Sequence, residues 1–188
     1  IDASEIGGIG VTDMLPAVVL LDSEGELLRP SIQQSDGRVA AEVEELRAEI
    51  DERAFIGQAG NGINQQLVAS KLRWIEKHEP DVFSRIATVF GSYDYVNWRL
   101  TCEKRVEQNW ALEAGFVDIR DHALSPALIA YSHLPASAIP PKARSHVVIG
   151  WVSDEAARVT GLAAGTPVVG GAADMIASAF AAGVVEDG

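Results

Sequence analysis

The chain of 188 residues has one cysteine, Cys102, and few basic residues. A single thiol cannot form a disulfide within the chain, so the sequence favours a reducing cytoplasm as its location. Cys102 itself is expected to be a small buried hydrophobe. Lysine and arginine together number 15, against 27 aspartates and glutamates, which gives a formal net charge of −12. Because nucleic acids and anionic membranes bind to basic faces, neither is expected as a partner.

Several kinds of site are also missing. No apolar run approaches the ~20 residues of a membrane-spanning helix, and no signal-peptide pattern is present. The four histidines are scattered without the spacing of metal ligands. Neither a Gly-x-x-x-x-Gly-Lys phosphate loop nor a Ser–His–Asp arrangement occurs. The residues therefore predict no metal site and give no sign of a serine-type hydrolase.

What is present indicates one globular α/β domain. Hydrophobic residues make up 47% of the chain, enough for a sizeable core. Apolar runs at 6–11, 17–21 and 26–32, with turn residues at 22–25, predict a β-meander. Pro30 places the third of these strands at an edge.

Helices and further strands follow the meander. Apolar residues at helical spacing predict helices at about 39–50, 65–77, 80–86, 93–100, 126–132 and 153–160. Short apolar runs predict strands at 88–90, 147–152 and 166–169. Asp36 is well placed to cap the first helix. The pattern therefore predicts a mixed sheet with flanking helices.

The most suggestive stretch is 165–183. A short β-branched strand is followed by Gly170 and Gly171, which allow a tight turn and a close approach of the backbone. Asp174 then opens a small-residue helix, whose positive end favours an ionised carboxylate. Turns of this kind carry ligands in α/β folds. The carboxylate is either a helix cap or a functional group, and the two roles are compatible.

Motifs along the chain add to this stretch. In order, they are Ile9-Gly-Val-Thr12 to Asp22, Leu28-Arg-Pro-Ser-Ile32 with Asp36-Gly-Arg38, Lys71-Leu-Arg-Trp-Ile75, Gly91-Ser-Tyr-Asp-Tyr95, Thr160-Gly-Leu162, Gly165-Thr-Pro-Val168 and Gly170 to Asp174. This ordered set resembles the first domain of the FGGY carbohydrate kinases, the family of glycerol kinase, xylulokinase and ribulokinase. The resemblance covers nearly the whole chain.

The resemblance implies a ribonuclease-H-like α/β domain of the actin/Hsp70 type. In the family this domain is paired with a second one, and ATP binds between them. Residues 1–188 are then expected to be a single domain that lacks the family's first strands, with their Asp-x-Gly motif, and its C-terminal nucleotide-binding domain. ATP and Mg²⁺ are expected for the full-length protein, without tight binding to this chain, which is expected to be inactive alone. Family members are often dimers, so a homodimer is a further expectation.

The resemblance also implies roles for five residues. Asp174 would be the catalytic base that orients the accepting hydroxyl and takes its proton. Leu15 and Pro16 occupy the corner where relatives carry sugar-contacting Met-His or Arg-Glu. Asp36 matches an aspartate near the sugar, and Met175 stands where relatives often have a substrate-binding Asn or Gln.

Three positions depart from the family pattern. Gln34 stands where a tryptophan is usual, Leu15-Pro16 offers no polar side chain, and Met175 lacks an amide. If phosphoryl transfer is kept, these changes predict a pentulose-like sugar or polyol other than the family's well-known substrates.

Two other functions stay open. A non-catalytic sugar-binding or sensing relative would tolerate the lost polar contacts, and an actin/Hsp70-like ATPase shares the fold. A ribonuclease-H-type nuclease would need clustered carboxylates for two metal ions and a basic face. The net charge of −12 disfavours that third function.

Overall fold

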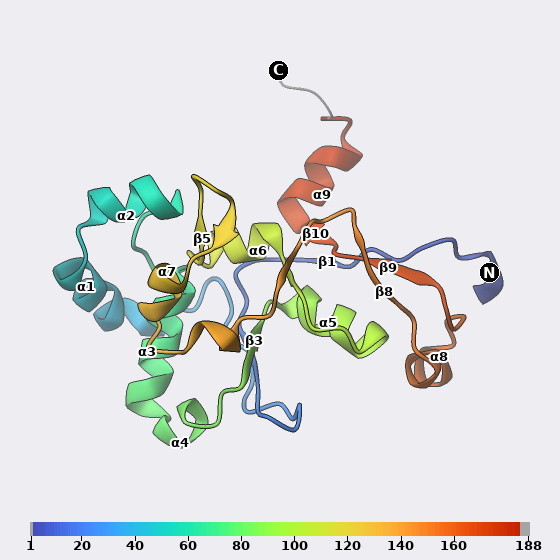
Figure 1. Ribbon diagram of the computed structural model, residues 1–188, viewed down its shortest axis with the longest axis horizontal. Coiled ribbons are helices and arrows are strands. Elements are labelled where there is room, and N and C mark those ends of the chain that lie inside the picture. The colour runs from blue at the N-terminus through green and yellow to red at the C-terminus, as the bar shows by residue number, and fades with distance from the viewer. Residues whose placement is uncertain (1, 185–188) are drawn as a thin grey trace.

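The structure, a computed structural model, describes residues 2–184 (Figure 1). Its strands are β1 (Thr12–Asp13), β2 (Val19–Leu21), β3 (Thr88–Phe90), β4 (Val106–Glu107), β5 (Val117–Asp118), β6 (Ala123–Leu124), β7 (Lys142–Ala143), β8 (Val148–Trp151), β9 (Pro167–Val169) and β10 (Ala172–Ala173). Its α-helices are α1 (Ala40–Glu49), α2 (Glu52–Ala59), α3 (Val68–His78), α4 (Pro80–Phe83), α5 (Ser92–Thr101), α6 (Gln108–Glu113), α7 (Pro126–Ala130), α8 (Asp154–Thr160) and α9 (Asp174–Ala181). The fold is a mixed α/β fold.

The helices and strands are distributed along an elongated molecule. Helices α1 to α4 and α7 gather at one end, and β8, β9 and α8 lie at the other, with β3, α5 and α6 between them (Figure 1). The central hydrophobic core joins β2, β3, α3 and α6. A second cluster fills the helical end, and a small third cluster joins α5, α8 and β9. Among the described residues, no helix is long and apolar enough to cross a membrane.

The strands pair two at a time, in both senses. The pairs β1–β10 and β4–β7 are parallel, and β2–β3, β5–β6 and β8–β9 are antiparallel. The mixed pairing that the sequence predicts is therefore present. It is divided among short ladders in the part of the chain that the structure describes.

The predicted β-meander is wrong for its first strand. Segments 17–21 and 26–32 do form a hairpin, with bridges Val18–Ile32 and Leu21–Leu27. Segment 6–13 leaves this hairpin and runs beside β9 and β10 at the other end of the chain, where Ile9 accepts from Val169 and donates to Pro167. Both arrangements satisfy the same apolar pattern, and local sequence does not distinguish them.

The prediction for Asp36 as a cap is confirmed, and the prediction for Cys102 as a buried residue is wrong. The Asp36 carboxylate accepts from the backbone N–H of Arg38 at 3.1 Å and caps a short 3₁₀ turn, Gly37–Val39, which leads into α1. Cys102, in contrast, is exposed rather than buried, because it ends α5 in the left-handed conformation with φ 63°. That conformation turns its side chain away from the buried face of the helix.

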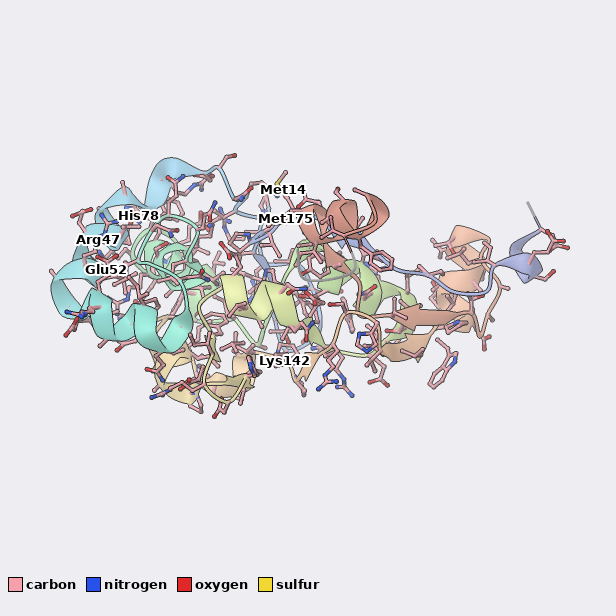
Figure 2. All side chains as sticks on the ribbon, turned by 90° about the horizontal axis from the view of Figure 1, so that it is seen from above. Met14, Arg47, Glu52, His78, Lys142 and Met175 are labelled. Carbon is pink, nitrogen blue, oxygen red and sulfur yellow. The ribbon has the colours of Figure 1, made fainter. Side chains whose placement is uncertain are left out.

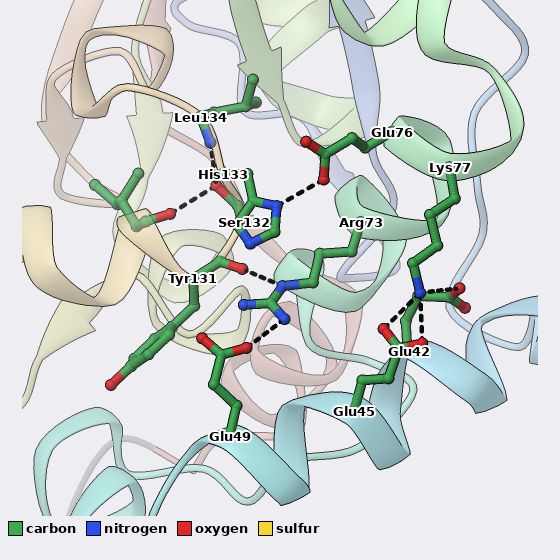
Figure 3. A network of polar contacts seen from close by, with 11 residues as sticks. Glu42, Glu45, Glu49, Arg73, Glu76, Lys77, Tyr131, Ser132, His133 and Leu134 are labelled. Carbon is green, nitrogen blue, oxygen red and sulfur yellow. Dashed lines mark hydrogen bonds and ion pairs between the residues drawn. The ribbon is translucent and has the colours of Figure 1, made fainter.

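Ion pairs join α1, α3 and the segment after α7 (Figure 3). The Arg73 guanidinium is almost fully buried and donates to Glu49 Oε2 at 2.6 Å and to the carbonyl oxygen of Tyr131 at 2.7 Å. The network also contains Lys77 with Glu42 and Glu45, and His133 with Glu76. Arg73 thus connects three segments that are distant in sequence.

We expect Arg73→Met to lower the free energy of unfolding by about 2 kcal/mol, because the Tyr131 carbonyl and Glu49 would lose a charged donor. The matched control is Arg158→Met, which breaks an exposed pair with Glu155. The control should change the free energy of unfolding by less than about 0.5 kcal/mol. Urea unfolding of both variants measures the difference. Equal losses would show that burial does not set the contribution of Arg73.

Candidate active site

The candidate site lies where two parallel strands end side by side. Thr12 pairs with Ala172 and Asp13 with Ala173, so Met14 and Asp174 leave the ladder at the same edge. Figure 2 shows Met14 and Met175 next to each other. Asp13 and Asp174 are both exposed, and each carboxylate accepts from the N–H of the following residue at 2.7 Å. Two carboxylates therefore face solvent on neighbouring strand ends.

The turn before Asp174 has no room for side chains. Gly171 has φ +85°, and a Cβ on it would lie 2.2 Å from the carbonyl oxygen of Val11. A Cβ on Gly170 would lie 2.6 Å from the carbonyl oxygen of Arg144. The predicted tight turn with close backbone approach is therefore confirmed. It lets residues 170–173 pass between segment 9–13 on one side and the segment around Ser145 on the other.

Asp174 is not the cap of its helix. Ala173 occupies the capping position of α9, and no side-chain cap hydrogen bond is made there. Asp174 is the first helical residue, and its carboxylate accepts from the neighbouring Met175 N–H. Of the two roles that the sequence left open, the cap is therefore wrong. The exposed carboxylate is available to a ligand at the positive end of the helix.

A cavity of about 570 Å³ lies between α9 and segment 10–12. Its walls come from residues 10–12, Ser145, His146, Val169, residues 171–172, Ile176, Ala177 and Phe180. Asp174 is not among these residues, so the cavity flanks the carboxylate. The apolar side chains of α9 form one wall, although Phe180 stays 70% exposed and α9 has no buried residue in this structure.

The structure places the predicted sugar corner differently. Leu15 and Pro16 are both buried, and Leu15 belongs to the central core. Neither therefore presents its side chain at the open edge. Asp13 and Met14 stand there instead. The sequence signal for this edge is the acidic residue Asp13, which comes shortly after the apolar run 6–11. That a parallel strand ends beside it is visible only in the structure.

Met175 and Asp36 lie in different surroundings. Met175 is 70% exposed and directly follows Asp174 at the edge. Asp36 is half-buried before α1, and no hydrogen bond or ion pair within residues 2–184 joins it to the β1–β10 edge. The structure thus brings together Asp13, Met14, Asp174 and Met175, and shows no direct polar contact between them and Asp36 among the described residues.

Asp36 has its own basic neighbours. A hydrogen-bonded ion pair with Arg38, 2.8 Å long, holds the pKa of Asp36 below its ordinary value. The Arg38 guanidinium also lies over the Trp74 ring, 4.8 Å from its centre. Lys71 is fully buried and donates to the carbonyl oxygen of Gln65 at 2.9 Å. Burial lowers the pKa of Lys71 to about 8, and the charge of Asp36 opposes that shift.

A buried polar cluster behind the edge is a second feature that the sequence did not predict. Asp94 is 2% exposed and accepts from the N–H groups of Gly91 at 3.1 Å and Glu107 at 2.9 Å. Burial raises the pKa of Asp94 to about 8, although these donors act in the opposite direction. Glu107 accepts from the Tyr93 hydroxyl at 2.8 Å, and burial with the nearby Glu107 charge raises the pKa of Tyr93. Acidic residues are rarely buried, so sequence gave no reason to expect the cluster.

These residues offer little to a metal ion. Between residues 2 and 184, no three His, Cys, Asp or Glu side chains gather in a way that could hold one. The two exposed carboxylates of the strand ends are instead suited to accept hydrogen bonds from hydroxyl groups.

The comparisons with known proteins point in one direction. The model of the FGGY family of carbohydrate kinases, N-terminal domain, matches residues 1–181. The crystal structure of a xylulose kinase from Rhodospirillum rubrum superposes with a TM-score of 0.95 at 60% sequence identity, over 96% of this chain and 38% of that one. A probable L-xylulose kinase of Pasteurella multocida is 29% identical over 189 residues, which is all of this chain and 39% of the relative.

A more distant structure shows the same fold. Plasmodium falciparum glycerol kinase with ADP matches with a TM-score of 0.86 at 18% identity, over 96% of this chain and 36% of that one. The chain therefore spans less than two fifths of the length of each of these relatives.

The buried Asp94 carboxyl makes stability depend on pH. Between its ordinary pKa of 3.8 and its folded pKa of about 8, the folded state holds a proton that the unfolded state releases. The contribution of Asp94 to the free energy of unfolding is therefore fully present below pH 3.8 and is lost as the pH rises through about 8. The slope is at most roughly 1.4 kcal/mol per pH unit.

Asp94→Asn lacks this titration, so the stability of the wild type relative to the variant should be highest at about pH 4 and should fall as the pH rises towards 8. Urea unfolding at several pH values measures that difference. A difference that does not change with pH would mean that Asp94 is ionised in the folded state throughout.

Proposed function

Because the chain belongs to the FGGY family of carbohydrate kinases, we propose that it is part of a longer kinase that phosphorylates a hydroxyl of a sugar or polyol. Asp174 is the general base of this reaction. The observation that carries the proposal is the exposed Asp174 carboxylate, which stands at the first turn of α9 without capping it. The proposal includes the assignment of residues 1–188 to a single ribonuclease-H-like domain of the actin/Hsp70 type.

The chemistry follows from the position of the carboxylate. One carboxylate oxygen of Asp174 accepts a hydrogen bond from the substrate hydroxyl. This hydrogen bond orients the hydroxyl oxygen for attack on the phosphoryl group. The same carboxylate takes the proton as the bond to phosphorus forms. The first turn of α9 places the Asp174 carboxylate at the exposed edge, where a substrate hydroxyl can reach it. ATP, when bound, supplies the phosphoryl group.

The donor side of the reaction belongs to the rest of the kinase. Within residues 2–184, no cluster of carboxylates, histidines or cysteines could hold a metal ion. We assign the phosphate and Mg²⁺ contacts to parts of the longer protein outside this chain. We also propose that the chain by itself binds Mg·ATP weakly and transfers no phosphate.

The acceptor is a pentulose or a related polyol. The names of the two xylulose kinases above support this class. At the edge, Asp13 adds a carboxylate acceptor beside the base, while Met14 and Met175 present apolar surface. This combination differs from the Met-His or Arg-Glu corner and from the Asn or Gln amide that, by the resemblance, relatives carry. The change favours a hydroxyl pattern different from that of D-xylulose.

We expect Asp174→Asn in the longer kinase to lower kcat by roughly 10²- to 10⁴-fold, because an amide cannot take the proton. Asp154→Asn is the matched control, since Asp154 is also an exposed aspartate at the first position of a helix. The control should keep wild-type kcat, and both variants should keep the wild-type unfolding midpoint. Steady-state kinetics and urea unfolding provide the measurements. Wild-type turnover in Asp174→Asn would sink the proposal, and sugar binding without turnover by the wild type would favour a sensor.

A substrate panel tests the acceptor class. With the longer kinase, kcat/KM is measured for D-xylulose, L-xylulose, D-ribulose, erythritol and glycerol. We expect the highest value for a pentulose other than D-xylulose, because the polar contacts of the corner are altered. Preference for glycerol or for D-xylulose would contradict this expectation.

A further inference from the structure

We propose that Asn97 is a positioning residue that holds the turn before Asp174 and thereby aims the carboxylate, an inference that rests on the function proposed above. Asn97 lies in α5 and is 1% exposed. Its Nδ2 donates to the carbonyl oxygen of Gly170 at 2.9 Å. It acts through the turn and makes no contact with substrate.

The Gly170–Gly171 turn depends on hydrogen bonds because it has no side chains to pack. The Gly170 N–H donates to the carbonyl oxygen of Val147 at 3.1 Å, and the Gly171 N–H donates to that of Ser145 at 3.0 Å. Asn97 adds the bond to the Gly170 carbonyl. Two residues of β10 then connect the turn directly to Asp174. A shift of the turn is therefore carried to the carboxylate.

The other side of the turn is held by the buried polar cluster. Ser145, whose carbonyl accepts from Gly171, donates through Oγ to Glu107 Oε1 at 2.7 Å. Glu107 is 1% exposed and is fixed in turn by the Tyr93 hydroxyl. The turn thus lies between two buried side-chain supports, Asn97 from α5 and Glu107 acting through Ser145.

The hydrogen bonding of the Asn97 side-chain amide indicates that Asn97 positions the turn and does not only fill space in the core. Its Nδ2 is bonded to Gly170, but its Oδ1 is buried and has no hydrogen-bond partner within residues 2–184. A buried acceptor without a donor costs stability, whereas an apolar side chain of similar size carries no such cost. Core stability therefore does not explain an asparagine here, and the bond to the turn does.

The test uses Asn97→Leu in the longer kinase. We expect kcat to fall roughly tenfold to a hundredfold while KM for the sugar changes less than about twofold, because small displacements of a catalytic group are costly. Thr101→Val is the matched control, since it removes a buried hydrogen bond to the Asn97 carbonyl and a partly buried one from the Glu103 N–H, and none to the turn. The control should keep wild-type kcat.

A double-mutant cycle separates positioning from a general weakening of the fold. If Asn97 acts through Asp174, then Asn97→Leu causes no further loss of kcat in the Asp174→Asn background. Losses that multiply, or a loss that appears in KM alone, would overturn the inference.

Amide hydrogen exchange of the peptide that spans 170–176 tests the turn without reference to activity. Exchange should be faster in Asn97→Leu than in wild type and unchanged in Thr101→Val. Unchanged exchange in both variants would overturn the positioning role even if Asp174 is confirmed as the base. Faster exchange in Asn97→Leu together with wild-type turnover in Asp174→Asn would instead overturn the proposed function and keep the role of Asn97 in the turn.

Discussion

Parallel pairing of β1 with β10 is the constraint on which the site depends. It joins the two ends of the chain through the pairs Thr12–Ala172 and Asp13–Ala173. Because parallel strands end at a common edge, this register places Asp13 and Asp174 on one open side of the molecule. A shift of one residue would change which side chains leave the ladder there. Backbone pairing therefore determines which side chains stand at the edge and, through them, what chemistry the edge can perform.

The ladder can form because the turn that leads into it contains glycine. Backbone carbonyls of Val11 and Arg144 lie where Cβ atoms of Gly171 and Gly170 would stand. The close approach leaves the turn without side-chain packing, so hydrogen bonds from neighbouring segments have to hold it. Behind it lies the buried polar cluster of Asp94 and Glu107, which would be costly in a purely structural core. The glycines allow the close backbone approach at the turn, and the buried polar cluster helps to hold that turn through hydrogen bonds.

The charge at the edge follows the acidic character of the whole chain. The chain is strongly acidic overall, with a net charge of −12, and the edge itself presents two carboxylates. Such an edge suits hydroxyl donors, which carboxylate oxygens accept from. In the proposed function, this edge is the acceptor side of the reaction.

Local sequence determined the elements whose causes are local. Helix α8 lies within the segment 153–160 that the sequence predicts to be helical, capped by Ser153 and ended by Gly161 with φ +77°. The glycine turn precedes the helix of Asp174, also as the sequence predicts. Tertiary structure decided the rest: that segment 6–13 joins β9 and β10, that Leu15 is buried while Asp13 is exposed, and that Ala173 takes the capping position. The physical reason is the distance along the chain between the residues that interact. Caps and turns depend on residues a few positions apart, whereas strand partners and burial depend on packing between segments that the sequence keeps far apart.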